Sequence, residues 1–196
     1  MNIFGSDIEI SETKYLELRQ ILVAYSLQYG TFTLASGAQS DVYLDVRKTA
    51  LRADGASLIG DLFMQSFRGK GYQAIGGMTL GADPILTAIT IASLRTSLPL
   101  HAIIIRKASK EHGTMNALEI AGGIPDGVEI AVLDDVVTSA GSTIKAIHAL
   151  RKQGYEVKDA YCIVDREANG EKKLDEIGVR LYSLFQLSDL LSEKNI

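Results

Sequence analysis

The stretch VLDDVVTSAGST, from Val132 to Thr143, carries the strongest structural signal in this chain. The apolar run over 130–133 is typical of a short strand that is covered on both faces. Two adjacent carboxylates, Asp134 and Asp135, follow where that strand should end. Because a helical pattern continues over 144–153, the segment predicts the strand, loop and helix of a parallel α/β sheet.

The loop in this segment predicts a binding site for a phosphorylated sugar. In open α/β sheets the ligand crevice lies beyond the carboxyl ends of the strands, where Asp134 and Asp135 could meet sugar hydroxyls. The residues that lead into the helix are Val136, Val137, Thr138, Ser139, Ala140, Gly141, Ser142 and Thr143. Backbone N–H groups at a helix start, flanked by hydroxyls, form a cradle for a phosphate. An ordinary capped turn explains one hydroxyl only, and the chain has neither a Walker loop nor a G-x-G-x-x-G motif.

The whole chain of 196 residues fits one domain, 1–196, with a hydrophobic content of 46% that is ample for a core. We expect residues up to about 45 to form an N-terminal helix and a small hood, and about 46–196 to form the core. Strands and helices alternate in the core, which predicts a mostly parallel sheet flanked by helices. The expected helices are 12–29, 52–68, 84–95, 141–153 and 171–177, and the expected strands are 31–34, 42–46, 74–77, 101–105, 129–133, 157–164 and 179–185.

Composition argues against several classes of protein. The formal net charge of -4 disfavours a general nucleic-acid binder. The single cysteine, Cys162, lies in an apolar run and predicts a buried, reduced thiol. No leader sequence or membrane span is evident, so we expect a cytoplasmic protein.

A second signal is the cationic segment IRKASKEHGTMNALE, Ile105 to Glu119. It leaves an apolar strand and places Arg106, Lys107, Lys110 and His112 within seven residues, which would suit a lid over a polyanionic leaving group. A solvated charged loop is the ordinary alternative. Its origin at a strand end, on the edge that carries the two acids, favours the lid.

These motifs resemble a known family. The 132–143 segment is similar to the phosphoribosyl diphosphate (PRPP) signature of type I phosphoribosyltransferases, and Arg-Lys-x-x-Lys-x-His-Gly resembles the catalytic loop of orotate phosphoribosyltransferases. The resemblance implies Mg²⁺-dependent transfer of ribose 5-phosphate from PRPP to orotate, in a homodimer whose lid also serves the partner's site. It implies no metal-ligating residue in the protein. Mg²⁺ would be held mainly by PRPP and water, with Asp134 and Asp135 nearby.

The resemblance also implies residue roles. The implied catalytic residues are Lys107, Lys110, His112, Asp134 and Asp135. The implied PRPP ligands are Arg106, Lys107, Lys110, His112, Asp134, Asp135 and the loop residues Val136 to Thr143. Thr138 would contact the orotate ring, and Arg166, in VDRE, would meet its carboxylate.

Three residues depart from the family pattern. Ala140 stands where a second glycine is common, and some members carry lysines at the positions of Ala35 and of Gly81 or its neighbour Leu80. The alternatives are a phosphoribosyltransferase for another base, a PRPP-sensing regulator and an inactive paralogue, and Ala35 and Gly81 keep the last of these open.

Overall fold

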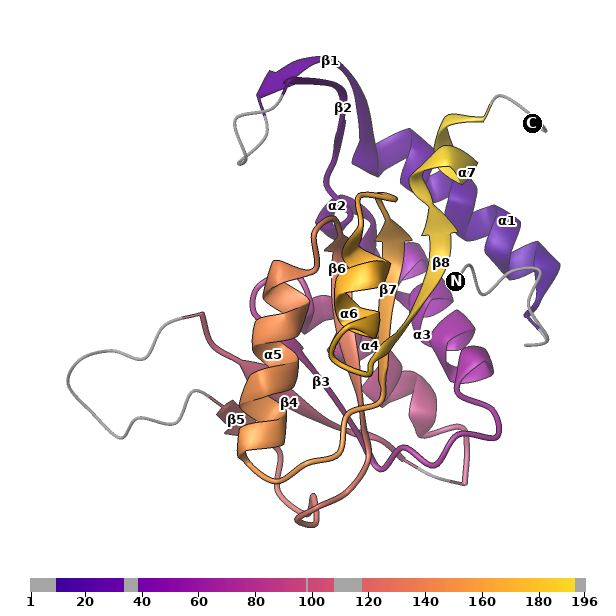
Figure 1. Ribbon diagram of the computed structural model, residues 1–196. Helices are drawn as coiled ribbons and strands as arrows, with labels where there is room; N and C mark the ends of the chain where they lie inside the picture. Colours follow the sequence, from indigo (N-terminus) through magenta and orange to yellow (C-terminus); the bar gives the residue numbers. More distant parts are fainter. Residues whose placement is uncertain (1–9, 34–38, 98, 108–117, 193–196) are drawn as a thin grey trace.

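A six-stranded sheet forms the centre of the computed structural model, which describes residues 10–33, 39–97, 99–107 and 118–192 (Figure 1). The strands lie in the order β5-β4-β3-β6-β7-β8, and all neighbours are parallel except β5, which is antiparallel to β4. Their bounds are β3 (Ala74–Met78), β4 (His101–Ile105), β5 (Leu118–Ile120), β6 (Ile130–Val137), β7 (Asp159–Asp165) and β8 (Arg180–Gln186). The predicted α/β architecture with a mostly parallel sheet is thus confirmed.

Helices cover both faces of the sheet (Figure 1). One face carries α1 (Glu12–Ile21), α3 (Ala53–Ser66) and α4 (Asp83–Ser93), and the other carries α5 (Gly141–Lys152) and α6 (Gly170–Asp175). The short helices α2 (Arg47–Ala50) and α7 (Leu187–Leu191) follow β2 and β8. Successive strand residues point to opposite faces, so Leu133 joins one buried cluster and Val132 the other. This explains why the apolar run of β6 is continuous rather than alternating.

A separate antiparallel hairpin stands over the carboxyl ends of the central strands (Figure 1). It consists of β1 (Leu27–Thr33) and β2 (Gln39–Leu44), and the turn between them lies outside the described residues. Figure 1 draws the hairpin at the top of the molecule, beyond the arrowheads of β6 and β7. The proposed division into a hood and a core stays a prediction.

The expected helix over 12–29 is wrong in its second half. The α-helix ends at Ile21, a π-helical turn, η1 (Leu22–Ser26), follows, and the chain is extended from Leu27. The physical reason is pairing with β2, in which Leu27 lies opposite Leu44. Aromatic and β-branched residues in this segment fit a strand better than a helix.

The expected end of the β6 strand is also wrong. The strand was predicted to end at Leu133, but it continues through Asp134 and Asp135 to Val137. Pairing with β7 sustains it, since Asp134 lies opposite Cys162 and Val137 opposite Asp165. The two acids therefore belong to the rigid strand and not to the loop after it. The short elements β5, α2 and α7 were not predicted.

In the part of the chain that the structure describes, no helix has the length and apolar character needed to cross a membrane.

Candidate active site

The carboxyl ends of the central strands and the end of the hairpin above them border an open cavity of about 330 Å³, which we call the strand-end cavity. Its wall comes from segments that are far apart in the sequence. The lining residues are Tyr43, Leu44, Asp45, Arg47, Met78, Thr79, Leu80, Gly81, Lys107, Asp134, Asp135, Val136, Thr138, Ser142 and Arg166. Open α/β sheets bind their ligands at this edge, so the structure brings both predicted acids to the expected place.

Asp134 links the end of β6 to the first turn of α5. Its Oδ2 accepts hydrogen bonds from the hydroxyls of Ser142, at 2.9 Å, and Thr143, at 2.8 Å. Its Oδ1 accepts from the backbone N–H of Asp135 at 3.0 Å. Burial of the carboxyl, followed by the neighbouring charge of Asp135, raises the pKa of Asp134 to about 6. The charged form of this acid is therefore costly to hold in the folded protein.

Asp135 is only partly buried and faces the strand-end cavity. Its Oδ1 accepts a hydrogen bond from the backbone N–H of Val136 at 2.9 Å. Gly81 packs directly against this carboxylate, because a Cβ added at Gly81 would lie 2.6 Å from Oδ1 and 2.8 Å from Oδ2. A side chain at position 81 would have to displace the acid, which accounts for glycine where some members of the resembling family carry lysine.

The loop after β6 turns sharply into α5. Ala140 has a φ of 58°, in the left-handed region, and its carbonyl accepts the first hydrogen bond of the helix from Ile144. An alanine in this conformation costs about 1–2 kcal/mol, which explains why glycine is common there. Val137 points into the core, whereas Val136 lines the cavity.

The predicted phosphate cradle lies at the start of α5. Thr138 and Ser139 are exposed before the helix, and Gly141 and Ser142 are exposed in its first turn. The first N–H groups of a helix have no partner within it, and they attract anions. The hydroxyls of Ser142 and Thr143 point to Asp134, so the donors left for a phosphate are the backbone N–H groups and the exposed hydroxyls of Thr138 and Ser139.

The predicted cations are only partly described. Lys107 and Arg166 line the strand-end cavity from the ends of β4 and β7. Arg106 does not line it, and its guanidinium instead pairs with Glu119 of β5 at 3.0 Å. Lys110 and His112 lie outside the described residues, as does the Ala35 position.

The sequence predicts a hood formed by residues up to about 45, but it did not single out the residues that the hairpin and α2 contribute to the cavity wall. Tyr43 and Asp45 lie at the end of β2, and Arg47 follows in the first turn of α2. Asp45 and Arg47 lie at the end of the expected strand 42–46, but their spacing does not by itself indicate a place in the cavity. The cavity also includes Thr79 and Leu80 at the end of β3.

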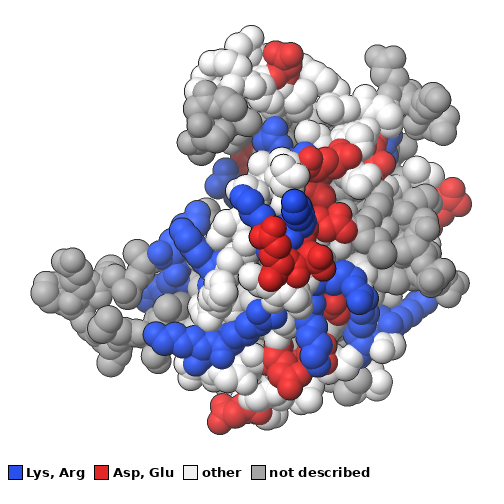
Figure 2. Space-filling view, viewed as in Figure 1, with Lys and Arg blue, Asp and Glu red and all other residues white. Residues whose placement is uncertain are grey.

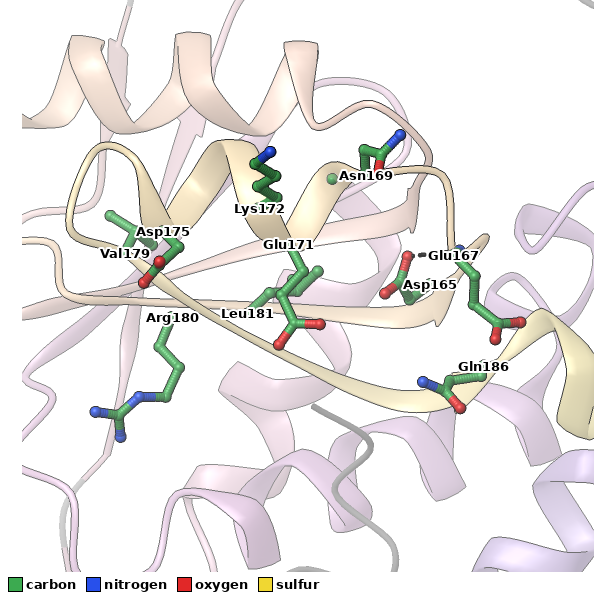
Figure 3. Close-up of a pocket in the computed structure, with 11 residues that line it drawn as sticks. Asp165, Glu167, Asn169, Glu171, Lys172, Asp175, Val179, Arg180, Leu181 and Gln186 are labelled. Atoms are coloured by element: carbon green, nitrogen blue, oxygen red, sulfur yellow. Dashed lines mark hydrogen bonds between the residues drawn. The ribbon is translucent and has the colours of Figure 1, made fainter.

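A larger hollow of about 640 Å³ lies beside α6 and β8, and we call it the α6 hollow (Figure 3). Figure 3 shows Asp165 and Glu167 toward the right of the view and Glu171 and Asp175 on α6. The Asp165 carboxylate accepts a hydrogen bond from the backbone N–H of Glu167 at 2.9 Å. Burial raises the pKa of Asp165. This hollow shares no lining residue with the strand-end cavity.

Charged side chains of both signs are interspersed over the face that carries α5 and α6 (Figure 2). Lysines and arginines alternate there with aspartates and glutamates, so that face presents no field of one sign. A polyanionic ligand therefore depends on the cations gathered inside the strand-end cavity and not on this outer surface.

Comparisons with known proteins show which family the chain is similar to. No family model matches the chain. An orotate phosphoribosyltransferase of Thermosynechococcus vestitus is 39% identical over 89% of this chain and 91% of its own length. A crystal structure of Mycobacterium tuberculosis orotate phosphoribosyltransferase in complex with Fe(III) dicitrate has a TM-score of 0.80 and 32% identity, covering 91% of this chain and 99% of that one. The same protein in complex with PRPP has a TM-score of 0.74 and 27% identity, covering 92% and 93%.

Proposed function

The chain belongs to the orotate phosphoribosyltransferase family, and on that premise we propose how its strand-end cavity performs the reaction. The enzyme transfers ribose 5-phosphate from PRPP to orotate, giving orotidine 5′-monophosphate and diphosphate. The observation that carries the assignment is the juxtaposition, in one cavity, of Asp134 and Asp135 with the helix start at Gly141 and with cations from two further strand ends.

The sugar phosphate would lie across the end of β6. We propose that Asp135 and Asp134 hold the ribose hydroxyls and that the backbone N–H groups of Thr138 to Thr143 hold the 5′-phosphate. The partial positive charge of the α5 start supports this orientation. The diphosphate group would then point toward Lys107 and the lid residues Arg106, Lys110 and His112.

Orotate would lie on the other side of the ribose. Arg166 leaves the end of β7 and lines the cavity, and its backbone N–H donates to the carbonyl of Val137 at 2.8 Å. The backbone of Arg166 is thereby joined to the end of β6, next to the loop that contains Thr138. We propose that Arg166 pairs with the orotate carboxylate and that Thr138 contacts the pyrimidine ring.

The chemistry needs positioning and electrostatics more than covalent catalysis. The bond between C1′ and the diphosphate oxygen breaks, and its electron pair leaves with diphosphate. N1 of orotate forms the new bond to C1′, and the proton lost from N1 balances the charge gained by diphosphate. Lys107, Lys110 and His112 would stabilise that growing charge, and His112 could supply a proton near neutral pH. A closed cavity would exclude the water that otherwise hydrolyses PRPP.

Mg²⁺ fits the residues that are present. Carboxylate, hydroxyl and phosphate oxygens are the ligands that this ion prefers. Among the described residues, no group of three acidic, histidine or cysteine side chains could hold a metal alone. We therefore propose that Asp135, with Asp134 nearby, shares the ion with PRPP oxygens and water. When bound, the ion neutralises charge on the diphosphate.

We also propose a homodimer with shared active sites. A second cleft of about 470 Å³, the α2–α4 cleft, adjoins the strand-end cavity and shares Arg47 and Leu80 with it. Its wall includes apolar side chains that are strongly exposed, among them Leu51 at 76% and Ile91 at 62%. Exposed apolar surface of this kind favours association. Sedimentation velocity should give the mass of two chains, and Ile91→Glu should give one.

The location follows from the substrate. PRPP carries several negative charges and does not cross a membrane unaided, so we propose that the enzyme acts in the cytoplasm where PRPP is made.

The test is orotate consumption followed by ultraviolet absorbance. Orotate should disappear only when enzyme, PRPP and Mg²⁺ are all present, with diphosphate formed in equal amount. Adenine, hypoxanthine, xanthine and uracil should not replace orotate as acceptors. Binding of PRPP without loss of orotate would contradict the proposal and would indicate another acceptor base, a PRPP-sensing protein or an inactive paralogue.

A further inference from the structure

Arg47 is a cation of the strand-end cavity that the family motifs do not include. It begins α2, two residues after Asp45, and the two side chains form a bidentate pair. Nε of Arg47 lies 2.8 Å from Oδ1 of Asp45, and Nη2 lies 3.0 Å from Oδ2. This pair lowers the pKa of Asp45, so the carboxylate stays charged and keeps the guanidinium in one orientation.

The pair rests on a rigid support. The backbone N–H of Asp45 donates to the carbonyl of Ser26 at 3.0 Å. The hydroxyls of Ser26 and Thr49 are hydrogen-bonded at 2.7 Å, and both residues are fully buried. The base of α2 is thereby fixed to η1. A cation held in this way loses little conformational entropy when it binds an anion.

Arg47 keeps donors that the protein does not use. A guanidinium has five N–H donors, and the pair with Asp45 occupies two of them. Among the residues that the structure describes, no other acceptor receives a hydrogen bond from this side chain, which is 42% exposed. The remaining donors are therefore available to a ligand in the cavity.

The position of Arg47 in the cavity indicates which group of the substrate it could contact. It lies where the strand-end cavity meets the α2–α4 cleft, and Leu80 of the loop after β3 lines both. The hydrogen bond and charge of Asp45 raise the pKa of Arg47, and the nearby charge of Asp135 adds to the shift. The phosphate cradle follows β6, and Arg166 follows β7, which lies on the side of β6 away from β3. Arg47 and Leu80 therefore border a different part of the cavity from Arg166.

From this geometry we propose that Arg47 binds the diphosphate group of PRPP and that Asp45 is its positioning residue. The inference rests on the function proposed above and adds a fixed cation to it. Arg47 thus supplies charge on the β3 side of the cavity, where Gly81 leaves no room for a cationic side chain beside Asp135. The guanidinium would meet two diphosphate oxygens while Asp45 fixes its other edge.

The chain contains a matched control for this pair. Arg52 and Asp54 have the same spacing, with Nε to Oδ1 at 2.9 Å and Nη2 to Oδ2 at 2.7 Å. The Arg52 guanidinium lies over the Tyr25 ring at 3.9 Å. It lines neither the strand-end cavity nor the α2–α4 cleft. Replacing it removes an equivalent arginine pair outside the proposed site.

The experiment compares Arg47→Gln with Arg52→Gln in the full chain. Calorimetry with inorganic diphosphate and Mg²⁺ measures binding, and initial rates at varied PRPP and orotate measure turnover. Loss of a charge-assisted bidentate contact predicts that Arg47→Gln raises the Kd for diphosphate about 10-fold and lowers kcat/KM for PRPP about 10- to 100-fold. The KM for orotate should stay within about two-fold. Arg52→Gln should leave all three values within about two-fold.

Two further variants keep the test decisive. Arg47→Lys retains the charge but not the fork, and it should recover part of the diphosphate affinity. Asp45→Asn should weaken diphosphate binding less than Arg47→Gln does, provided that circular dichroism shows all variants folded. An unchanged diphosphate Kd in Arg47→Gln, or a rise in the orotate KM alone, would overturn the assignment. If the unmodified enzyme consumes no orotate, the proposed function fails, and the diphosphate Kd still tests Arg47.

Discussion

The strand-end cavity and the α6 hollow both lie beside acidic residues, but they differ in what surrounds those acids. The strand-end cavity has about half the volume of the α6 hollow, at about 330 Å³ against about 640 Å³. In the cavity, Asp134 accepts hydrogen bonds from two hydroxyls in the first turn of α5, and cations line the wall from three other segments. In the hollow, Glu171 and Asp175 lie on α6, a helix of six residues.

This difference shows that volume alone does not identify a site. A ligand with both a phosphate and hydroxyl groups needs donors and acceptors that converge from separate elements. The strand-end cavity has them because the strands of a parallel sheet all end at one edge. The α6 hollow is bordered by neighbouring segments of the same β7–α6–β8 unit. Four substitutions and one control substitution test whether the two regions differ as described.

The largest effect is expected for Asp135→Asn. The change removes a negative charge that faces the strand-end cavity while leaving the shape of the side chain nearly unchanged. Loss of one electrostatic contact of this kind typically costs 10²–10³ in rate, or about 2.7–4 kcal/mol. Steady-state kinetics should show kcat/KM for PRPP lower by that factor. A decrease of less than about five-fold would remove Asp135 from the catalytic centre.

Asp134→Asn should change stability in a pH-dependent way. The pKa of Asp134 is raised from 3.8 to about 6 in the folded protein, so the charged form is destabilising there. Ionisation of Asp134 therefore lowers the free energy of unfolding of the native protein as pH rises from about 4 to about 6. Above pH 6 this loss is constant. The displacement corresponds to about 3 kcal/mol.

Urea denaturation at pH 4, 5, 6 and 8 measures this difference. The free energy of unfolding of Asp134→Asn, relative to the unchanged protein, should rise through this range and level off. Activity should fall despite the gain in stability, because the ribose loses a charged ligand. A difference that is flat with pH would contradict the raised pKa.

Gly170→Ala tests the layer that separates the two regions. A Cβ at Gly170, which begins α6, would lie 2.5 Å from Cγ1 of Val137 and 2.8 Å from the carbonyl oxygen of Thr138. Overpacking of this kind typically costs about 1–3 kcal/mol and shifts the backbone. We expect a lower melting temperature and a higher KM for PRPP, measured by thermal denaturation and by kinetics.

Gly71→Ala is the control for that substitution. No atom lies within 4 Å of a Cβ added at Gly71, and its φ is not in the left-handed region. Its stability and KM should be nearly unchanged. Equal effects of the two substitutions would mean that α6 does not support the loop after β6.

The smallest effect is expected in the α6 hollow. Glu171→Gln removes a charge from α6 that Figure 3 draws pointing toward β8. Exposed substitutions of this type usually change stability by less than about 0.5 kcal/mol, and kcat/KM for PRPP and for orotate should stay within about two-fold. A ten-fold loss of kcat/KM would show that the α6 hollow contributes to the reaction and would contradict the distinction between the two regions.

Much of the fold could be predicted because its strands are buried on both faces. The apolar runs of β3, β4 and β6 predict these strands from the local sequence alone. The end of the first helix could not be predicted in the same way. Leu27 becomes extended because it pairs with Leu44, seventeen positions later, and local propensity does not contain that contact.

The residues of the candidate site also differ in whether the local sequence predicts their proximity. Asp134, Asp135 and the turn at Ala140 form one continuous motif, so their proximity follows from the sequence. Arg47 reaches the cavity only because the hairpin stands over the sheet, and no spacing along the chain announces that placement. The close contact of Gly81 with Asp135 likewise joins two strands and needs coordinates to be seen.

The hydrogen bonds of Asp134 have a consequence for the size of the sugar that the enzyme accepts. Because one carboxylate joins the end of β6 to the first turn of α5, the distance between the hydroxyl-binding acids and the phosphate-binding turn is set before any ligand enters. A sugar phosphate bound as proposed must span that fixed length. A phosphorylated sugar with one carbon fewer or more would satisfy one end and leave the other unbound.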